Sequence, residues 1–328
     1  MPQLFDEKAR ECSRSINDPL AMRLQIRKSR TVGLEQETKA PRGRKSRTSG
    51  REREAKAPGL WADVFLGRSY DTGPNGKQIV SVIIPARNEE KTVARNIAIA
   101  RSAFQETEDV EVEVIVTDGC SEDSTREEIL KAGPDHFLEV PPGKGNAMRE
   151  GFLHSRGDVV LFSDADLLNF EARWIEMVAE PILQGRADVV LGVGISPWFQ
   201  GATETIYRPL IKLLFPEVEE RISRQPLTGQ RAFRRWVLAG LDLLPDYGVE
   251  AAMNIDLVNM KPPPRIQEVF LGEKRDVWKG NLEMYREVGR AILLKACQYE
   301  RLSRLRESNF SHLVEILNQL LSEIDLQV

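Results

Sequence analysis

The chain has 328 residues, of which 41% are apolar and 29% are charged. These proportions exclude a collagen, a long coiled coil and a wholly disordered chain, and they fit one or two globular domains. A chain of this length buries about 75% of the surface that it exposes when unfolded, so its fold needs no disulfide or metal staple. The three cysteines are odd in number and far apart, which argues against a disulfide framework and for a reducing compartment.

Charge is distributed unevenly along the chain. The net charge is −4, but residues 1–58 carry +7, so the remainder carries −11. A basic segment suits nucleic acid or an anionic membrane, but the plainer interpretation is a solvated, disordered tail over residues 1–76. The sequence offers neither a run of about 18 apolar residues nor the apolar centre of a secretory signal. We therefore expect a cytoplasmic protein with no integral membrane segment and no nucleic-acid partner.

Four buried strands are predicted in the part of the chain that follows the tail. They are runs rich in β-branched residues at 79–85, 110–118, 158–166 and 187–195. Helical patterns follow the strands, at residues 93–104, 121–133, from about 145, and 174–183. Strands that alternate with helices form right-handed βαβ units, so we predict an α/β fold with a mostly parallel sheet flanked by helices.

The later part of the chain divides into two further regions. Prolines interrupt residues 196–280, which we expect to complete a catalytic domain over 77–280 together with the strands and helices of 77–195. Residues 281–328 are predicted to form a helical extension. Its last helix places an apolar stripe on one side, which docks on the core or on a second subunit: Leu313, Ile316, Leu317, Leu320 and Ile324.

An Asp-x-Asp motif follows the third predicted strand. Asp164 and Asp166 alternate there, so both carboxylates can face one hard cation, Mg²⁺ or Mn²⁺, which also keeps water and substrate phosphates as ligands. In isolation such a motif is more often a turn or a helix cap. Its place after a buried strand, at the edge of the sheet where ligands bind, favours a metal site.

Two other strand-end loops indicate a nucleotide. PARNEE at residues 85–90 and Asp118, at the end of the second strand, are each more often capping residues when considered alone. Because the two loops follow neighbouring strands, together they favour a nucleotide-binding site. Lys144 lies between two glycines at a helix start, where backbone N–H groups and an ammonium suit a phosphate. The P-loop and dinucleotide-binding spacings are absent, which leaves an ATPase, a GTPase or a dehydrogenase without support.

These motifs, with three later segments, resemble the glucosyl-3-phosphoglycerate synthases, which are GT-A glycosyltransferases. The later segments are TETIYRPLIKLLFPE, QPLTGQRAFRR and PDYGVEAAMNIDL, beginning at residues 203, 225 and 245. The similarity covers roughly residues 78–280. It implies a retaining enzyme that moves glucose from UDP-glucose to the 2-hydroxyl of 3-phosphoglycerate, a small anionic acceptor, with a divalent metal. A homodimer is also expected from this resemblance.

The resemblance further implies a role for individual residues. The uridine is expected to lie against Pro85, Ala86, Arg87, Asn88, Glu89 and Asp118. Lys144 is expected at the phosphates or the sugar, and Asp166 with Asp164 at the metal and the ribose. Thr228 and Gly229 match the stretch that lines the donor sugar, Tyr247 and Glu250 match residues that face the reacting glucose, and Thr203 matches the acceptor loop.

Two positions depart from the pattern of that family. Asp276 stands nearest the place of a histidine metal ligand; an aspartate oxygen is a competent ligand for Mg²⁺, so we expect the site to survive with altered affinity. The acceptor-loop arginine is missing from residues 200–205, which weakens the case for 3-phosphoglycerate more than the case for a sugar nucleotide.

The expected mechanism follows from the charges of the reaction. Breaking the sugar–phosphate bond leaves a charged diphosphate, which a metal on Asp166 and the ammonium of Lys144 stabilise. Asp166, Tyr247 and Glu250 are the candidate catalytic residues, and Glu250 orients or deprotonates the acceptor hydroxyl unless it merely starts a helix.

Three alternatives stay open at this point. The donor is UDP-glucose or GDP-mannose. A polyprenyl-phosphate glycosyltransferase at the membrane surface shares the first-half motifs. A nucleotide-sugar binding protein that has lost catalysis would explain both departures.

Overall fold

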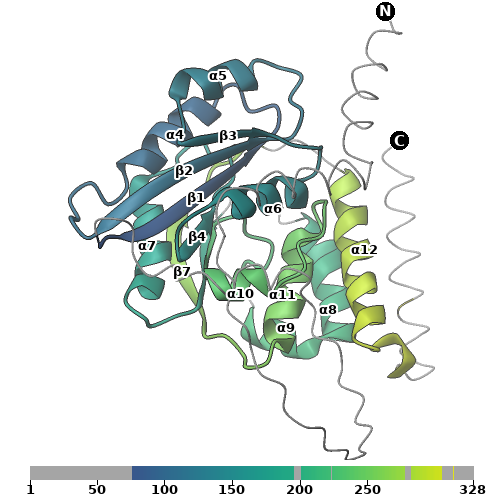
Figure 1. The fold of residues 1–328 in the computed structure, drawn as a ribbon. Coiled ribbons are helices and arrows are strands. Elements are labelled where there is room, and N and C mark those ends of the chain that lie inside the picture. Colours follow the sequence, from purple (N-terminus) through teal and green to yellow (C-terminus); the bar gives the residue numbers. More distant parts are fainter. Residues whose placement is uncertain (1–75, 196–200, 223, 278–281, 305–312, 314–328) are drawn as a thin grey trace, which may run out of the picture. The chain divides into compact units, whose positions relative to one another are not determined.

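A seven-stranded mixed sheet lies at the centre of the part of the chain that the computed structural model describes, which is residues 76–195, 201–222, 224–277, 282–304 and 313 (Figure 1). All of these residues belong to one unit of the chain, Pro58–Val328. The strands are β1 Gln78–Ala86, β2 Val110–Asp118, β3 His136–Glu139, β4 Val159–Phe162, β5 Val189–Ile195, β6 Arg231–Arg234 and β7 Ile266–Glu273.

The strand order is β3-β2-β1-β4-β6-β5-β7. All neighbouring pairs are parallel except those of β6, which runs antiparallel to both β4 and β5. The register of β1 and β2 aligns Ala86 with Asp118, so the loops that follow these two strands start side by side. The sheet therefore gathers the ends of β1, β2 and β4 at one edge.

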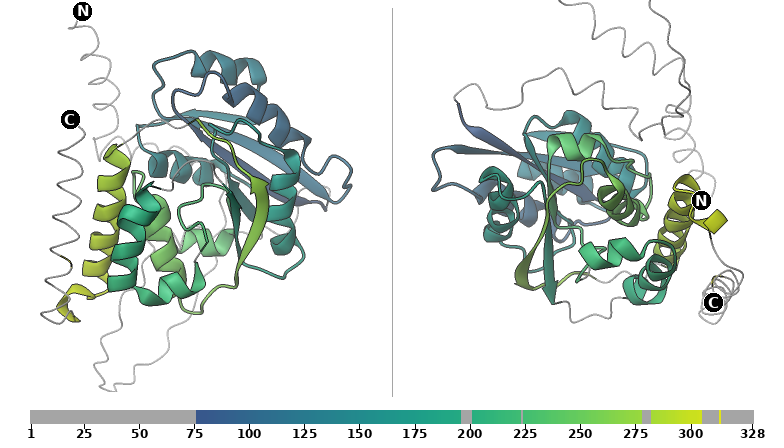
Figure 2. Two further views of the ribbon diagram at one scale, coloured as in Figure 1. Left: turned by 180° about the vertical axis from the view of Figure 1, so that it is seen from behind. Right: turned by 90° about the horizontal axis from the view of Figure 1, so that it is seen from below.

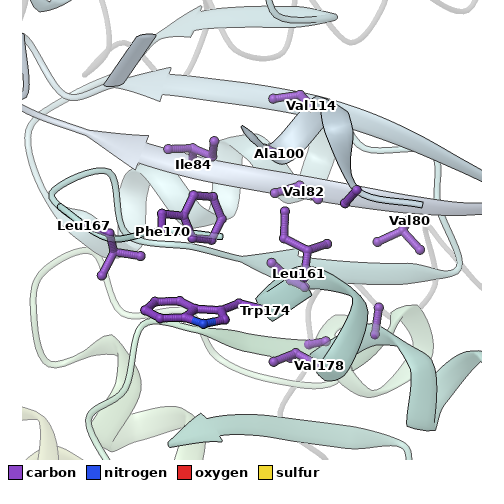
Figure 3. Close-up of a cluster of buried hydrophobic side chains, with 14 of the residues drawn as sticks. Val80, Val82, Ile84, Ala100, Val114, Leu161, Leu167, Phe170, Trp174 and Val178 are labelled. Atoms are coloured by element: carbon purple, nitrogen blue, oxygen red, sulfur yellow. The ribbon is translucent and has the colours of Figure 1, made fainter. Parts of the chain in front are cut away.

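Both faces of the sheet are covered by helices, because successive side chains of β1 point to opposite faces. Val80, Val82 and Ile84 pack against three helices on one face, where Figure 3 shows Trp174 and Val178 beneath the strands. These helices are α4 Val93–Ser102, α5 Thr125–Ala132 and α7 Ala172–Leu183. On the other face, Ile83 packs with residues of α6 Lys144–His154, α10 Arg235–Ala239 and α11 Val249–Asn259.

A separate group of helices extends the second face (Figure 2). It consists of η1 Thr203–Tyr207, which is a π-helix, α8 Arg208–Leu214, α9 Pro216–Arg221 and α12 Leu282–Gln298, followed by the 3₁₀ turn η2 Leu302–Arg304. Their apolar side chains form one buried cluster with Ala251 and Ile255 of α11. This group attaches α11 and α12 to the same body, and both helices contribute to the site described below.

The predicted α/β fold with a mostly parallel sheet is confirmed. The four predicted strands correspond to β1, β2, β4 and β5, although β4 ends at Phe162, so the Asp-x-Asp motif lies in the loop after it. The strands β3, β6 and β7 were not predicted. No helix in the described part of the chain is long and apolar enough to cross a membrane.

Several expectations fall outside the residues that the structure describes. These are the tail at 1–75 and most of the apolar stripe near the carboxyl terminus, of which only Leu313 is described, and it is buried. The division into tail, catalytic domain and helical extension stays a prediction.

Candidate functional site

A cleft of about 700 Å³ opens at the carboxyl ends of β1, β2 and β4. Its lining comes from the loops after these strands, from the start of α6, from the segment before α11, and from α12. Nine of the residues singled out in the sequence line it: Pro85, Ala86, Arg87, Glu89, Lys144, Asp164, Asp166, Tyr247 and Glu250. Residues far apart in the sequence therefore meet where the sheet places its strand ends.

The loop after β1 is fixed against the loop after β2 by hydrogen bonds. Asn88, which has a left-handed backbone (φ 57°), accepts a bond from the N–H of Glu122 at 2.8 Å, and its own N–H donates to Ser121 Oγ at 2.9 Å. The N–H of Ser124 donates to Glu90 Oε2 at 3.1 Å. Asn88 thus holds the two loops together and is not among the cleft-lining residues, whereas Glu89 lines the cleft.

Asp118 lies behind the cleft wall. Its side chain is 3% exposed and accepts hydrogen bonds from the hydroxyl and the N–H of Ser121, and the neighbouring Gly119 lines the cleft in its place. Burial raises the pKa of Asp118, with Ser121 opposing the shift. The structure gives Asp118 a role in shaping the loop after β2.

Lys144 lies at the centre of the charged part of the cleft. Its Nζ atom is 2.7 Å from Asp164 Oδ1 and 2.6 Å from Glu250 Oε1. Burial alone would lower the pKa of Lys144, but the two carboxylates outweigh it and raise that pKa above its usual range. Lys144 is therefore a permanent cation that joins the loop after β4 to the helix α11.

Two backbone N–H groups in the first turn of α6 are not free to bind an anion. The N–H groups of Gly145 and Asn146 donate to the carbonyls of Asp246 and Pro245, at 3.3 and 2.9 Å. A Cβ atom on Gly145 would lie 1.6 Å from the carbonyl oxygen of Leu244, so this contact requires glycine. The expectation that backbone N–H groups meet a phosphate is therefore wrong for Gly145 and Asn146, because the segment before α11 occupies them. Gly143, Lys144 and Ala147 line the cleft.

Asp164 is held by the turn that precedes β6. Gln230 Nε2 donates to Asp164 Oδ2 at 3.3 Å, and a Cβ atom on Gly229 would lie 2.0 Å from the same oxygen. Thr228 is buried and donates to the carbonyl of Gly192 at 2.7 Å. Thr228 and Gly229 therefore lie behind Asp164 and are not among the residues that line the cleft.

Lys274 is a buried cation behind this turn that the sequence did not single out. It donates to Thr228 Oγ1 at 3.3 Å, and burial lowers its pKa. Burial raises the pKa of Asp164, but the cations Lys144 and Lys274 outweigh it and lower the pKa overall. Lys274 lies two residues before Asp276, in the segment that was singled out for a possible metal ligand. Nothing in the sequence marks Lys274 as buried.

Asp166 is the carboxylate whose ionisation is most disfavoured. Burial, with the neighbouring charges of Asp164 and Glu89, raises its pKa to about 7. The segment carrying Asp276 pairs with the loop of Asp166: Val277 N–H donates to the Asp166 carbonyl at 3.2 Å, and Leu167 pairs with Asp276. Burial also raises the pKa of Asp276.

This donor set fits a divalent cation that shares its ligands with a substrate. Crowded, buried carboxylates favour a cation between them, and Gln230 Oε1, beside Asp164, is buried with no hydrogen-bond partner in the structure. The described residues contain no group of three or more His, Cys, Asp or Glu side chains that could hold a metal ion on their own. Mg²⁺ is commonly bound in this incomplete way, by one or two carboxylates plus substrate phosphates.

The far wall of the cleft is acidic, which the sequence did not reveal. Asp246, Glu283 and Glu287 line it with Tyr247, whose N–H donates to Glu287 Oε2 at 2.9 Å. Burial and the charges of Asp246 and Glu283 raise the pKa of Glu287. The described lining holds seven carboxylates and two cationic side chains, so the cleft is strongly negative. Glu283 and Glu287 lie one turn apart on α12, a spacing common on solvated helices, so only the fold reveals that they face a cleft.

Thr203 is buried at the start of η1 and is not among the lining residues. Residues 196–200 of the acceptor loop lie outside the described residues. Residues 201–207 contain no arginine.

Comparison with known proteins gives consistent results. Residues 81–231 match the family described as glycosyl transferase family 2. The glucosyl-3-phosphoglycerate synthase of Mycobacterium tuberculosis is 31% identical over 216 residues, which cover 59% of this chain and 65% of that protein. The chain thus spans just under two thirds of the length of this relative.

Two crystal structures are similar over more than two thirds of this chain. That of the M. tuberculosis synthase in complex with Mn²⁺, UDP-glucose and phosphoglyceric acid has a TM-score of 0.59 and 30% identity, covering 68% of this chain and 80% of that chain. That of the mannosyl-3-phosphoglycerate synthase from Rubrobacter xylanophilus has a TM-score of 0.62 and 27% identity, covering 70% and 77%.

Proposed function

Because the chain belongs to glycosyl transferase family 2 and has the GT-A fold, we propose that it transfers glucose from UDP-glucose to 3-phosphoglycerate, with retention at the anomeric carbon. The observation that carries this proposal is the position of Lys144, whose ammonium bridges Asp164 and Glu250 in the cleft. A cation at this point suits a diphosphate leaving group on one side and a carboxylate facing the sugar on the other.

The residues of the cleft divide the work of the reaction. Lys144 attracts the diphosphate of the donor, and Glu89 lies in the loop expected at the nucleoside. Asp166, with Asp164, would hold a divalent cation; when bound, that cation supplies Lewis-acid stabilisation of the departing diphosphate. The positive charge of the cation would offset both the mutual repulsion of these carboxylates and their repulsion of the diphosphate.

Glu250 is the residue that we assign to the acceptor hydroxyl. It is 4% exposed, lies in the first turn of α11, and lines the cleft. When a diphosphate competes for the Lys144 ammonium, Glu250 is left as a hydrogen-bond acceptor that orients the hydroxyl of the acceptor molecule. Tyr247, 37% exposed, lies beside it at the mouth of the cleft.

The acidic far wall favours a second candidate, transfer to an uncharged acceptor. A phosphoglycerate carries negative charge, and Asp246, Glu283 and Glu287 repel it unless residues outside the described ranges or the metal offset them. A neutral polyol such as glycerol meets no such repulsion. The donor is likewise open to comparison, because one structural relative is a mannosyl-3-phosphoglycerate synthase.

A transfer assay tests these proposals directly. Purified protein with Mg²⁺ is given UDP-glucose or GDP-mannose, each alone, with 3-phosphoglycerate, and with glycerol. The expected result is release of UDP that depends on 3-phosphoglycerate, with a product that NMR shows to have the α configuration. Release that depends on glycerol alone would favour the second candidate. Donor binding without release under any acceptor would contradict both and favour a binding protein.

A further inference from the structure

A fully buried polar network connects three segments that surround the cleft. Tyr207, Arg231 and Asn254 each have 0% exposed surface. Asn254 Nδ2 donates to the Tyr207 hydroxyl at 3.1 Å and to the carbonyl of Pro226 at 2.6 Å. Arg231 donates to Asn254 Oδ1 at 3.3 Å and to the carbonyls of Pro226 and Thr228 at 3.1 and 2.8 Å.

Each member of the network belongs to a different functional segment. Tyr207 ends η1, the π-helix that begins at the acceptor-loop residue Thr203. Asn254 lies on α11 four residues after Glu250, a spacing that puts both side chains on the same side of the helix. Arg231 follows the turn at 226–229, in which Leu227 lines the cleft and Gly229 contacts Asp164.

The chemistry of the network makes its arrangement rigid. Arg231 is a buried guanidinium that donates to three neutral oxygens, and among the described residues no carboxylate forms an ion pair with it within 4.0 Å. Loss of one partner leaves a buried polar group unsatisfied, which costs more than the bond itself contributes. Such networks therefore permit few arrangements of the segments that they join. π-helical turns such as η1 are rare, and they occur frequently at functional sites.

We propose that Tyr207 and Asn254 are positioning residues that couple the acceptor-side helix η1 to Glu250 and to the donor-side turn 226–229. A shift of η1 is transmitted through the Tyr207 hydroxyl to Asn254, and from there to Pro226 and Arg231. The network touches no substrate; it sets how Glu250 and the turn face each other across the cleft. This inference rests on the proposed function for its catalytic consequence, but the coupling itself is a property of the folded chain.

Tyr207→Phe is the variant that tests the coupling with the least disturbance. It removes only the hydroxyl that accepts from Asn254, and leaves the ring in its apolar cluster. Tyr299→Phe is the matched control, because the Tyr299 hydroxyl also bonds a side chain of α11, donating to Asp256 Oδ1 at 3.0 Å, outside the network. Asn254→Asp is a second variant that keeps the acceptor for Arg231 but loses both donated bonds.

Hydrogen exchange measured by mass spectrometry gives a readout that does not depend on activity. We expect Tyr207→Phe to raise exchange at 225–231 and in the first turn of α11 as well as at η1, whereas Tyr299→Phe leaves these peptides unchanged. A rise confined to η1, or equal effects of the two variants, would overturn the coupling.

Kinetics then test its consequence. In Tyr207→Phe and Asn254→Asp we expect kcat for transfer to fall about tenfold, because small misplacements of reacting groups carry large costs. The donor KM should stay within about twofold, and transfer should fall relative to donor hydrolysis. Equal loss of transfer and hydrolysis would contradict a positioning role. If the wild type transfers to no acceptor, the proposed function fails, and the exchange data still decide the coupling.

Discussion

The side chain of Asp166 makes the stability of the protein depend on pH. Its pKa is raised to about 7 by burial and by the charges of Asp164 and Glu89. An unfolded chain binds this proton only below about pH 4, so between these two values the folded form holds a proton that the unfolded form has released. Stability from this group is therefore present at low pH and is lost as pH rises towards 7.

Calorimetry in EDTA can detect this loss. We expect the Tm of the wild type to fall between about pH 5 and pH 8 by a few degrees more than the Tm of Asp166→Asn, which has no proton to lose. Parallel pH dependences of the two proteins would show that Asp166 titrates as an ordinary carboxyl.

The close contact between Gly229 and Asp164 leads to a second prediction. A Cβ atom here would lie 2.0 Å from Asp164 Oδ2, so Gly229→Ala must displace the carboxylate or the turn. We expect UDP affinity measured by calorimetry with Mg²⁺ to fall at least tenfold, since an aspartate of the proposed cation site moves. Gly289→Ala is the matched control: its nearest contact is Ile206 at 3.5 Å, and alanine in a helix gains up to about 1 kcal/mol. Unchanged UDP binding in Gly229→Ala would mean that UDP binding does not depend on the present position of the Asp164 carboxylate.

At the level of single residues, the sequence predicted those whose charge follows a strand. Asp164, Asp166 and Glu89 are of this kind, and they line the cleft. It did not predict Arg231 and Lys274, because a lysine or an arginine is normally exposed and its burial depends on partners from distant segments. The prediction for the start of α6 failed in part for a similar reason: the N–H groups of Gly145 and Asn146 donate to carbonyls of residues 246 and 245, about 100 positions later in the chain.

The element α12 is fixed to α11 by a buried ion pair. Lys295 Nζ lies 2.7 Å from Asp256 Oδ2, and both side chains are almost fully buried. We expect Lys295→Met to lower the free energy of unfolding by about 3–5 kcal/mol, because it leaves a buried carboxylate unpaired. Denaturant titration measures this loss.

The double variant Lys295→Met with Asp256→Leu serves as its control. It removes both charges, so most of the stability should return. If the double variant is no more stable than Lys295→Met alone, the ion pair is not what fixes α12.

Among the strands, predictability follows the pattern of apolar residues. β1, β4 and β5 contain apolar runs rich in Val, Ile and Leu, and β2 alternates Val with Glu before a Val-Ile-Val run; these four strands were found. β6 has arginine at both ends, which reads as solvent-exposed chain; it becomes a central strand only because turn carbonyls accept from Arg231 and Asp158 pairs with Arg234. β3 has four residues, too few for a periodic signal.

Over the molecule as a whole, the charge of the cleft opposes the ligand that we propose for it. Seven carboxylates face two cationic side chains in the described lining. We therefore expect UDP to bind at least tenfold more weakly in EDTA than in Mg²⁺, because the cation offsets charge on both partners. Uridine, which lacks phosphate, should bind equally in both conditions. UDP affinity that is insensitive to the metal would contradict the cation site.

The place of β6 decides how this protein can be recombined with its relatives. β6 follows η1, α8 and α9 in the sequence, yet it lies between β4 and β5, two strands that precede these helices. A chimera joined at residue 195 would therefore bring a foreign strand into the middle of the sheet and a foreign turn against Asp164. Exchange of acceptor specificity is better attempted as a cassette that begins after β5 and ends before residue 225, which leaves the sheet and its turn with one parent.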